Sequence, residues 1–497
     1  MKKVVNVFMI VLTATVFLYS CGKDTPSPDN GGPDPGGGNG GKTELILPQK
    51  EMRGAWIATV WALDWPRTAN FASEAYNAAV QKASYTAMLD MLKSRGFNTV
   101  FVQVRGMGDA FYNSPYEPWS GNITGTRGQD PGYDVMQFMI DEAHARGLEF
   151  HAWINPYRIS TRASAATPYP ALHSAVNASW VVDHEKIRIY NPALPEVRQR
   201  LADIVKDIIT KYNIDGLHMD DYFYPDPSSA GAMVSDQALY EQYGAGYATI
   251  QDWRRDNVNK AIQMIYNTIV ANKREVVFSI SPAASRTYNL NTLYADVAKW
   301  CQEGWVDILI PQLYQEIGNT SNDYQINLST WAQYAYSARL VIGHALYRFG
   351  VAGNPAAFQS TQELVKQFDL SKKNTKAVGS VMYSARDVYH NRIGITDKLA
   401  ELYSHKAVMP FAGREVAPAT AIPANVSITG NELSWSAVSG NNVRYVVYHF
   451  SDVKKEGKVV DVTAATKVNV TDAGHYSVTS LNIDHLESKP SDPVQKN

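Results

Sequence analysis

The feature that most constrains the fold is one rhythm repeated from residue 53 to residue 385: a short apolar run, a polar loop and a stretch with helical spacing. Eight of the runs have the length and composition of buried strands: 53–60, 98–104, 148–155, 214–220, 275–281, 307–314, 339–346 and 379–385. Strands that alternate with helices indicate a parallel sheet. Eight such units favour a (β/α)8 TIM barrel, because an open doubly wound sheet usually carries a Gly-rich nucleotide turn that is missing here.

Three of the intervening stretches carry the start or stop signals of helices. The stretches 79–96 and 135–147 each end on a basic residue followed by Gly, and 195–212 opens with a proline. We therefore expect helices to connect the strands, and we assign residues 48–412 to the barrel.

The pattern changes after Phe411. A Pro- and Ala-rich connector is followed by short alternating runs at 432–438, 444–450, 467–470 and 475–482. These runs predict a small all-β sandwich over 416–497. It resembles a fibronectin type III module with Trp435 as its core tryptophan, and we expect a spacer or docking unit without catalytic residues.

The amino terminus has the composition of a secretory signal. Lys2 and Lys3 precede an apolar run, 4–18, that is too short for a comfortable membrane span. The residues just before Cys21 resemble a bacterial lipobox. The resemblance implies a signal peptide over 1–20, cleavage before Cys21 and lipidation of that residue.

The segment 21–47 is a flexible tether rich in Pro and Gly, of the kind that holds a domain away from a membrane. The three residues after Cys21, Gly-Lys-Asp, partly resemble the signal that sends Bacteroidetes lipoproteins to the cell surface. We therefore expect an outer membrane lipoprotein, on either the periplasmic or the cell-surface face.

The overall composition is that of an ordinary globular protein, with 45% hydrophobic and 19% charged residues. The formal net charge of −2 gives no electrostatic reason to expect nucleic acid as a partner. The 11 Trp and 29 Tyr fit a carbohydrate enzyme, since sugar rings stack on aromatic side chains, and fit equally a large core with a Tyr-rich surface.

The stretch DGLHMDDYFYP (215–225) places two carboxylates at the end of the fourth strand. Alternate residues of a barrel strand face the axis and the helices. Leu217 and Met219 share the helix-facing parity, so His218 and Asp220 face the axis. Asp220 also falls at the carboxyl end of the strand, where barrel enzymes build their active sites. Asp221 lies at the lip, and its direction stays open.

The same test on the other strands predicts that many polar and aromatic side chains converge on one mouth. They are Gln103, Arg105, His151, Trp153, Asn155, His218, Asp220, Gln312, Tyr314 and Glu316, together with His344 on the seventh strand. Buried polar groups cost free energy unless they bind each other or a ligand. Arg105 could instead neutralise Asp220, and an inward His is often only a hydrogen-bonded core residue.

A metal site is the competing use of these residues. His151, His218, Asp220 and Asp221 could together hold zinc or another divalent ion. The histidines come from separate strands, however, and neither HxH nor HExxH spacing occurs. We therefore predict neither a metal nor another cofactor.

Several motifs together resemble the family-10-like glycosyl hydrolases, bacterial barrel proteins often exported as lipoproteins. They are RGAWIATVWALDWP, FNTVFVQVRGMGDAFYNS, EFHAWINPYR, DGLHMDDYFYP and PQLY. The resemblance implies a glycoside hydrolase, and it suggests peptide-free glycan strands of peptidoglycan as the polysaccharide partner. DGLHMD also resembles the fourth-strand motif of α-amylase and α-galactosidase barrels, whose last Asp is the nucleophile; that role falls on Asp220.

Glycoside hydrolysis needs a carboxylic acid to protonate the leaving oxygen and a second carboxylate to attack the sugar or activate water. We expect Asp220 to be the nucleophile or base. Adjacent residues on an extended strand diverge, so we prefer Glu316 as the acid, with Asp221 second and Asp109 a weaker candidate.

The remaining predicted site residues are binding residues. Five would hold sugar hydroxyls or tune Asp220: Arg105, His151, Asn155, His218 and Gln312. Seven are candidate stacking platforms, some of which will only be packing residues: Trp61, Trp65, Trp119, Trp153, Tyr157, Tyr222 and Tyr314. Two other functions remain open, a non-catalytic glycan-binding lipoprotein and a metal-dependent deacetylase or amidase that acts on the same polymer.

Overall fold

The computed structural model describes residues 44–66, 75–164, 166–410, 414, 420–440, 443–482 and 485–497. The predicted signal peptide, Cys21 and nearly all of the tether lie outside these residues. From Leu45 to Asn497 the chain forms one compact unit. Among the described helices, none has both the length and the apolar character needed to cross a membrane.

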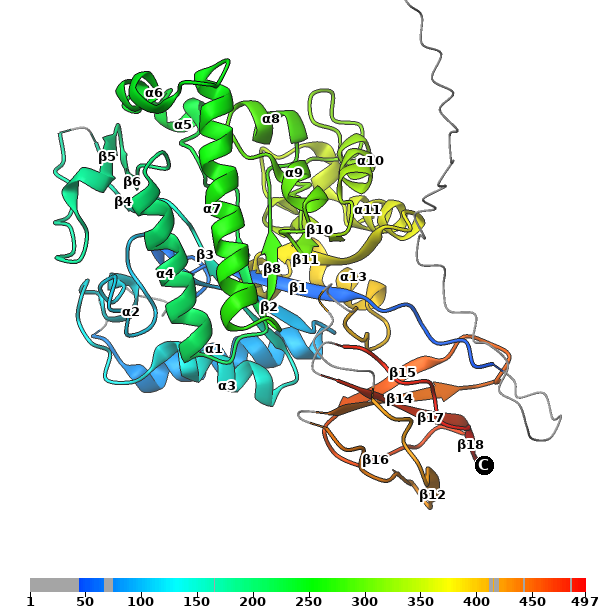
Figure 1. Cartoon of the computed structure of the whole chain (residues 1–497). Helices are drawn as coiled ribbons and strands as arrows, with labels where there is room; N and C mark the ends of the chain where they lie inside the picture. Colours follow the sequence, from blue (N-terminus) through cyan, green and yellow to red (C-terminus); the bar gives the residue numbers. More distant parts are fainter. Residues whose placement is uncertain are drawn as a thin grey trace, which may run out of the picture. The chain divides into compact units, whose positions relative to one another are not determined.

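Eight parallel strands close into a barrel (Figure 1). In chain order they are β1 (Met52–Ile57), β2 (Thr99–Arg105), β3 (Glu149–Ile154), β7 (Gly216–Met219), β8 (Val277–Ile280), β9 (Ile308–Leu309), β10 (Arg339–Ala345) and β11 (Ala377–Tyr383). Neighbours along the chain are neighbours in the barrel, and β11 closes onto β1. The predicted fold class and all eight predicted strands are confirmed.

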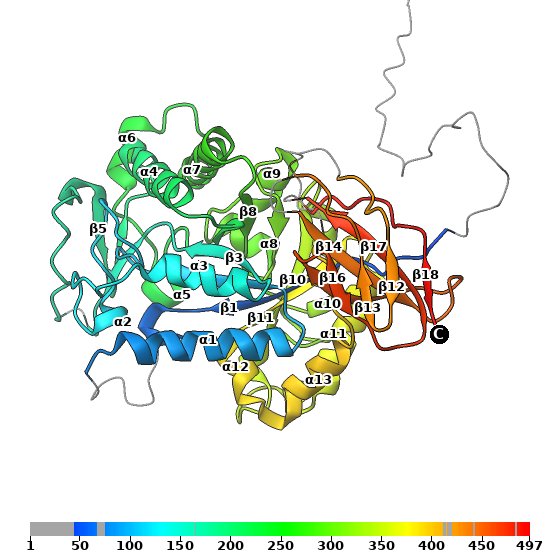
Figure 2. The ribbon, with the colours of Figure 1, turned by 90° about the horizontal axis from the view of Figure 1, so that it is seen from below.

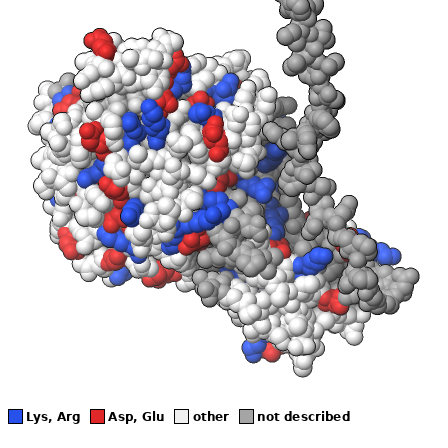
Figure 3. Space-filling view, in the orientation of Figure 1, with Lys and Arg blue, Asp and Glu red and all other residues white. Residues whose placement is uncertain are grey.

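Helices surround the barrel (Figures 1 and 2). The longer ones are α1 (Ala78–Ser94), α3 (Val135–Ala145), α4 (Pro195–Lys211), α7 (Ile250–Asn272), α10 (Tyr324–Tyr334) and α11 (Gln362–Lys373). The shorter ones are α2 (Gly121–Thr124), α8 (Arg286–Asn291), α9 (Val297–Gln302), α12 (Ala385–His390) and α13 (Ile395–Leu402). The three predicted helices are α1, α3 and α4. On the face shown in Figure 3, basic and acidic side chains are interspersed over the barrel.

The local sequence explains where the helices begin. The side chain of Asn77 accepts hydrogen bonds from the backbone of Ala79 and Val80 at the start of α1. Asp134 does the same for Gln137 in α3, and Pro195 occupies the first turn of α4. These residues satisfy or remove backbone N–H groups that have no partner within the helix.

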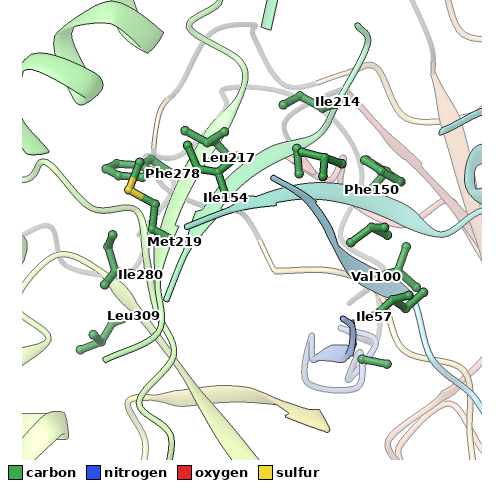
Figure 4. Close-up of a cluster of buried hydrophobic side chains, with 14 of the residues drawn as sticks. Ile57, Val100, Phe150, Ile154, Ile214, Leu217, Met219, Phe278, Ile280 and Leu309 are labelled. Atoms are coloured by element: carbon green, nitrogen blue, oxygen red, sulfur yellow. The ribbon is translucent and has the colours of Figure 1, made fainter. Parts of the chain in front are cut away.

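The main apolar core lies between the strands and the helices. Its strand residues include Val100, Phe150, Leu217, Met219 and Phe278, which stand on one side of their strands in Figure 4. A second cluster, with Trp56, Phe101, Trp153, Ile310 and Val381, fills the barrel interior. The two clusters confirm the predicted parity of the second, third and fourth strands.

The parity predicted for the seventh strand is wrong. His344 packs against Phe368 of α11, and its Nδ1 lies 3.0 Å from Gln367 Oε1, so the ring faces the helices. Val341 belongs to the interior cluster instead. Gly343, two residues on, has no side chain to mark the inward face, which is why the polar His344 was misleading.

Two excursions of the chain after barrel strands build up one side of the barrel mouth. After β3, the strands β4 (Arg158–Thr161), β5 (Val181–His184) and β6 (Ile187–Tyr190) form an antiparallel sheet of order β4-β6-β5. After β7 come α5 (Pro227–Ala230) and α6 (Gln237–Tyr243). The sequence analysis did not predict the three strands, because runs of four residues are too short to show a period.

The carboxyl-terminal segment forms two antiparallel sheets, drawn in orange and red in Figure 2. One sheet is β12 (Ser427–Thr429), β13 (Glu432–Ser434) and β16 (Lys467–Asn469); the other is β15 (Lys458–Thr463), β14 (Arg444–Phe450), β17 (Gly474–Leu481) and β18 (Val494–Lys496). Trp435 is 6% exposed and its ring centroid lies 5.3 Å from that of Tyr445. The predicted sandwich is confirmed, and its likeness to a fibronectin module stays a prediction.

Candidate active site

Asp220 follows the last residue of β7 and is 4% exposed. Its Oδ2 accepts hydrogen bonds from Asn155 Nδ2 at 2.6 Å and from Trp153 Nε1 at 3.2 Å. Its Oδ1 accepts one from the backbone N–H of Tyr222 at 3.3 Å. Three N–H donors therefore surround this carboxylate, and each of them favours its charged form.

A chain of amides fixes the donor that faces Asp220. Gln103 Oε1 accepts from the backbone N–H groups of Thr59 and Val60, at 3.1 and 2.9 Å. Its Nε2 therefore points the other way and donates to Asn155 Oδ1 at 2.6 Å. Because Asn155 Oδ1 is occupied, Asn155 must present its Nδ2 donor to Asp220. The backbone at the end of β1 thus determines the hydrogen bonding of the carboxylate.

Asp221 stays next to Asp220 because the chain bends after β7 instead of continuing as a strand. The side-chain amide of Gln312, which donates to the carbonyl of Ser281, lies close enough to Asp221 to stabilise its charged form. Burial and the neighbouring Asp221 carboxylate raise the pKa of Asp220 to about 7, while the Arg158 guanidinium opposes the shift. Burial also raises the pKa of Asp221. The sequence analysis expected the side chains of adjacent acids to diverge, as they do on an extended strand. That expectation does not apply here, because the chain bends at Asp221.

A pocket of about 360 Å³ opens beside this pair. The excursions after β3 and β7 supply most of its lining, which is Tyr157, Arg158, Ile187, Ile189, Asp221, Tyr222, Phe223, Tyr224, Pro225, Asp226, Ser229, Ala230, Tyr288 and Leu293. Tyr222 is 43% exposed, and the guanidinium carbon of Arg158 lies 3.3 Å from the centroid of its ring. A pair of acids thus adjoins a pocket with aromatic walls, which is the form of a ligand-binding site.

A group of three tyrosines lies on the side of β9, β10 and β11. The ring centroids of Tyr314, Tyr347 and Tyr383 are 6.0 Å apart in each pairing. Asp64, in the loop after β1, holds the residues that follow Tyr383: its Oδ1 accepts from Ser384 Oγ at 2.6 Å and from the backbone N–H of Arg386 at 2.9 Å.

The sequence analysis missed the role of Asp64, because the contact joins residues at opposite ends of the barrel sequence. Burial raises the pKa of Asp64 to about 6. The only signal was its place in the quoted motif RGAWIATVWALDWP, just past the first strand.

Arg105 does not neutralise Asp220 in the structure. It forms a buried, bidentate ion pair with Glu117, at 2.7 and 2.6 Å, and its Nη1 donates to the carbonyl of Asn155. Glu117 is a further residue that sequence reasoning missed. The pair holds the backbone of Asn155 in place, so Arg105 affects the site only by positioning Asn155.

Breaking this pair should destabilise the fold. Glu117→Gln leaves the buried Arg105 charge without a counter-charge, and we expect the free energy of unfolding to fall by about 3–5 kcal/mol. Urea titration at pH 7 measures the change. Glu303→Gln is the control, because its pair with Lys299 is exposed and should contribute under about 1 kcal/mol. Equal losses in the two variants would contradict the prediction.

Both predicted binding histidines lie below the mouth. His218 is fully buried, with Nε2 accepting from Trp56 Nε1 at 3.0 Å and Nδ1 at 2.8 Å from Ser279 Oγ. His151, four residues before Asn155, packs against Phe101 and has Nε2 at 3.2 Å from Glu149 Oε2. Burial lowers the pKa of His218 well below its usual value, so its ring is neutral. Within the described part of the chain, no three His, Cys, Asp or Glu side chains group as a metal site would require.

Glu316, the preferred acid in the sequence analysis, is not among the residues that line the pocket. Its Oε1 accepts from Asn319 Nδ2 at 2.9 Å in the loop before α10. Asp109 hydrogen-bonds Ser120, and Trp65 is a buried packing residue whose Nε1 donates to the carbonyl of Gln81. Trp119 packs at the edge of the main core.

Comparisons with known proteins show the family of the chain. The model of the family described as Glycosyl hydrolase-like 10 matches residues 51–359. The chain belongs to the glycosyl hydrolase-like 10 family. The match covers every barrel strand except the last and includes all five motifs quoted in the sequence analysis.

Two named relatives support the assignment to this family. Glycosyl hydrolase YngK of Bacillus subtilis is 35% identical over 484 residues, covering 90% of this chain and 94% of that protein. Glycosyl hydrolase DigH of Escherichia coli K12 is 33% identical over 417 residues, covering 77% and 93%. Among solved structures, the PgaB (BpsB) glycoside hydrolase domain of Bordetella bronchiseptica has a TM-score of 0.48 at 12% identity, covering 72% of this chain and 99% of that one.

Proposed function

We propose that the protein is a glycoside hydrolase that cleaves O-glycosidic bonds in the peptide-free glycan strands of peptidoglycan. The observation that carries the proposal is the pair of adjacent carboxyls, buried Asp220 and half-buried Asp221, at the mouth of a barrel from a glycosyl hydrolase-like family. The family resemblance supports the polymer, and the names of the two relatives support the reaction.

The surroundings of the two carboxyls suggest different roles for them. A protonated carboxyl needs an acceptor for its O–H, but the partners of Asp220 are all donors. Asp221 has fewer donors around it. The raised pKa of Asp220 indicates that the two carboxyls share one proton at neutral pH, and the donors around Asp220 favour the form in which Asp220 is ionised and Asp221 carries that proton. Asp221 then protonates the glycosidic oxygen as the C–O bond breaks, and ionised Asp220 attacks the anomeric carbon or activates the water that does so. This replaces Glu316 with Asp221 as the proposed acid.

The substrate assay tests the proposal directly. The protein is incubated with peptide-stripped peptidoglycan glycans and with a panel of α- and β-glucans, and new reducing ends are counted. Reducing ends from the stripped glycans alone would support both the reaction and the polymer. Binding to the stripped glycans without release of reducing ends from any substrate would favour a glycan-binding lipoprotein instead.

The shared proton predicts an alkaline limb in the pH profile. Since the pKa of Asp220 is raised to about 7, the pair keeps one proton below that pH and loses it as the pH rises. We expect kcat/KM to fall with a midpoint near pH 7, approaching tenfold per unit above it. Initial rates from pH 4 to pH 9 measure the limb, and a rate that stays constant to pH 9 would contradict it.

Trp61 is the exposed aromatic most suited to hold a sugar beyond the cleaved bond. It follows β1 with a φ of 54°, in the left-handed region, and its side chain is 66% exposed. A strained and exposed tryptophan at a barrel mouth suggests a function. We expect Trp61→Ala to raise KM for long strands about tenfold with little change in kcat, consistent with the loss of one aromatic contact. Trp119→Ala is the comparison, and equal effects would contradict a special role for Trp61.

A further inference from the structure

The pocket beside the acids contains one cation with an unusual environment. Three charged side chains line it: Arg158, Asp221 and Asp226. Asp226 is engaged locally, since it accepts from the backbone N–H and the hydroxyl of Ser228, both at 2.8 Å. The nearby Gln312 amide stabilises the charged form of Asp221. Arg158 is the member of the three whose charge is not used in this way.

Arg158 forms no ion pair within 4 Å among the described residues, although its charge opposes the rise in the pKa of both Asp220 and Asp221. One face of its guanidinium is covered by the Tyr222 ring, and its buried Nε has no hydrogen-bond partner in the described chain. Stacking of this kind leaves only the in-plane N–H groups for a ligand. Such an edge matches the two oxygens of a carboxylate.

Neutral sugars would not require this arrangement. Sugar hydroxyls are satisfied by amides and hydroxyls. The guanidinium of Arg158 stabilises the charged forms of Asp220 and Asp221 from beyond ion-pair distance, and its buried Nε–H is still without an acceptor, which a carboxylate on the ligand would supply. The pair Asp220 and Asp221 keeps one proton near neutral pH, so it does not repel an incoming anion with two full charges.

We propose that Arg158 binds a carboxylate carried by the sugar next to the cleaved bond, and that the pocket is a subsite for an acidic sugar. The inference rests on the proposed function. Removing the peptide from peptidoglycan leaves a free lactyl carboxylate on every second sugar, and that group is lost when a peptide is joined to it through an amide. Arg158 thus provides a physical reason for an enzyme to prefer stripped strands.

The experiment compares two forms of one substrate. Peptide-free strands are used as the free acid and after their carboxylates have been converted to methyl amides. We expect wild-type protein to cleave the acid form with a kcat/KM about 10- to 100-fold higher than the amide form, mainly through KM, because a charge-assisted pair is lost.

Variants of Arg158 show where the preference originates. In Arg158→Gln the ratio of the two kcat/KM values should fall to within about twofold of one, and Arg158→Lys, which keeps the charge but loses the fork, should be intermediate. Arg162→Gln is the matched control: this arginine lies on the same excursion but stacks on Tyr169 and donates to the carbonyl of Glu185. If Arg158 only tunes Asp220, then Arg158→Gln slows both substrates equally and keeps the ratio, which overturns the inference.

The outcomes also separate this inference from the proposed function. A wild-type protein that cleaves the acid and amide forms equally would overturn the acidic subsite and leave the proposed reaction standing. A polyuronate serves as the other source of sugar carboxylates. Cleavage of the polyuronate alone, lost in Arg158→Gln, would support the carboxylate subsite and overturn peptidoglycan as the polymer. Cleavage of none of these substrates would overturn both proposals.

Discussion

Asp220→Asn should lower kcat on peptide-free glycan strands by about 10⁴-fold while the protein stays folded. The substitution keeps the size of the side chain but removes the negative charge that the proposed mechanism needs at the anomeric carbon. The rate is measured by reducing-end release, and binding of the strands is measured separately by co-sedimentation. Binding should survive, because the pocket walls remain in place.

Asp183→Asn is the control for this variant. Asp183 lies on the excursion after β3, pairs with Arg188 at 2.5 Å and is half exposed. It should keep at least half of the wild-type rate. Equal rates for wild type and Asp220→Asn would remove Asp220 from the mechanism, whatever the behaviour of Asp183→Asn.

The second large effect distinguishes the two candidate acids. We expect Asp221→Asn to lose about 10²–10⁴-fold in kcat on natural strands, and Glu316→Gln to stay within about threefold of wild type. The reason is their placement: Asp221 lines the pocket, whereas the Glu316 carboxylate is held by Asn319. Initial rates on the same strand preparation give the comparison.

A substrate with a different leaving group tests the role itself. An acidic phenol departs without protonation, so an aryl glycoside of a strand fragment should restore most of the activity of Asp221→Asn but not that of Asp220→Asn. If Glu316→Gln shows the selective loss on natural strands instead, Glu316 regains the role of the acid.

Much of the site could be predicted because the barrel strands obey a period of two. The parity that places Leu217 and Met219 among the helices also places Asp220 on the axis, and the same holds for Gln103 and Asn155. A closed parallel barrel leaves a strand little freedom to rotate, so once a run is assigned to the barrel, the alternation of its residues fixes the direction of its side chains.

The parts that could not be predicted lie where that period ends. The direction of Asp221 depends on a bend, and the partners Glu117 and Asp64 depend on loops whose course no local pattern determines. His151 and His218 face the axis as expected, but depth along the strand separates them from the mouth, and parity contains no information on depth. Glu316 follows the short strand β9, where the period of two has ended, so parity could not show whether it lines the pocket.

The amide chain from Thr59 through Gln103 and Asn155 has a consequence for how the enzyme can change. None of these groups gains or loses a proton over the working range of pH. The peptide N–H groups therefore keep an N–H donor directed at Asp220 whatever the pH. The acids, the pocket and the substrate could therefore change without any change in this amide chain. Conversely, Gln103→Glu would replace the Nε2 donor by a second carboxylate oxygen, so Asn155 would turn its Nδ2 toward residue 103 and its Oδ1 toward Asp220.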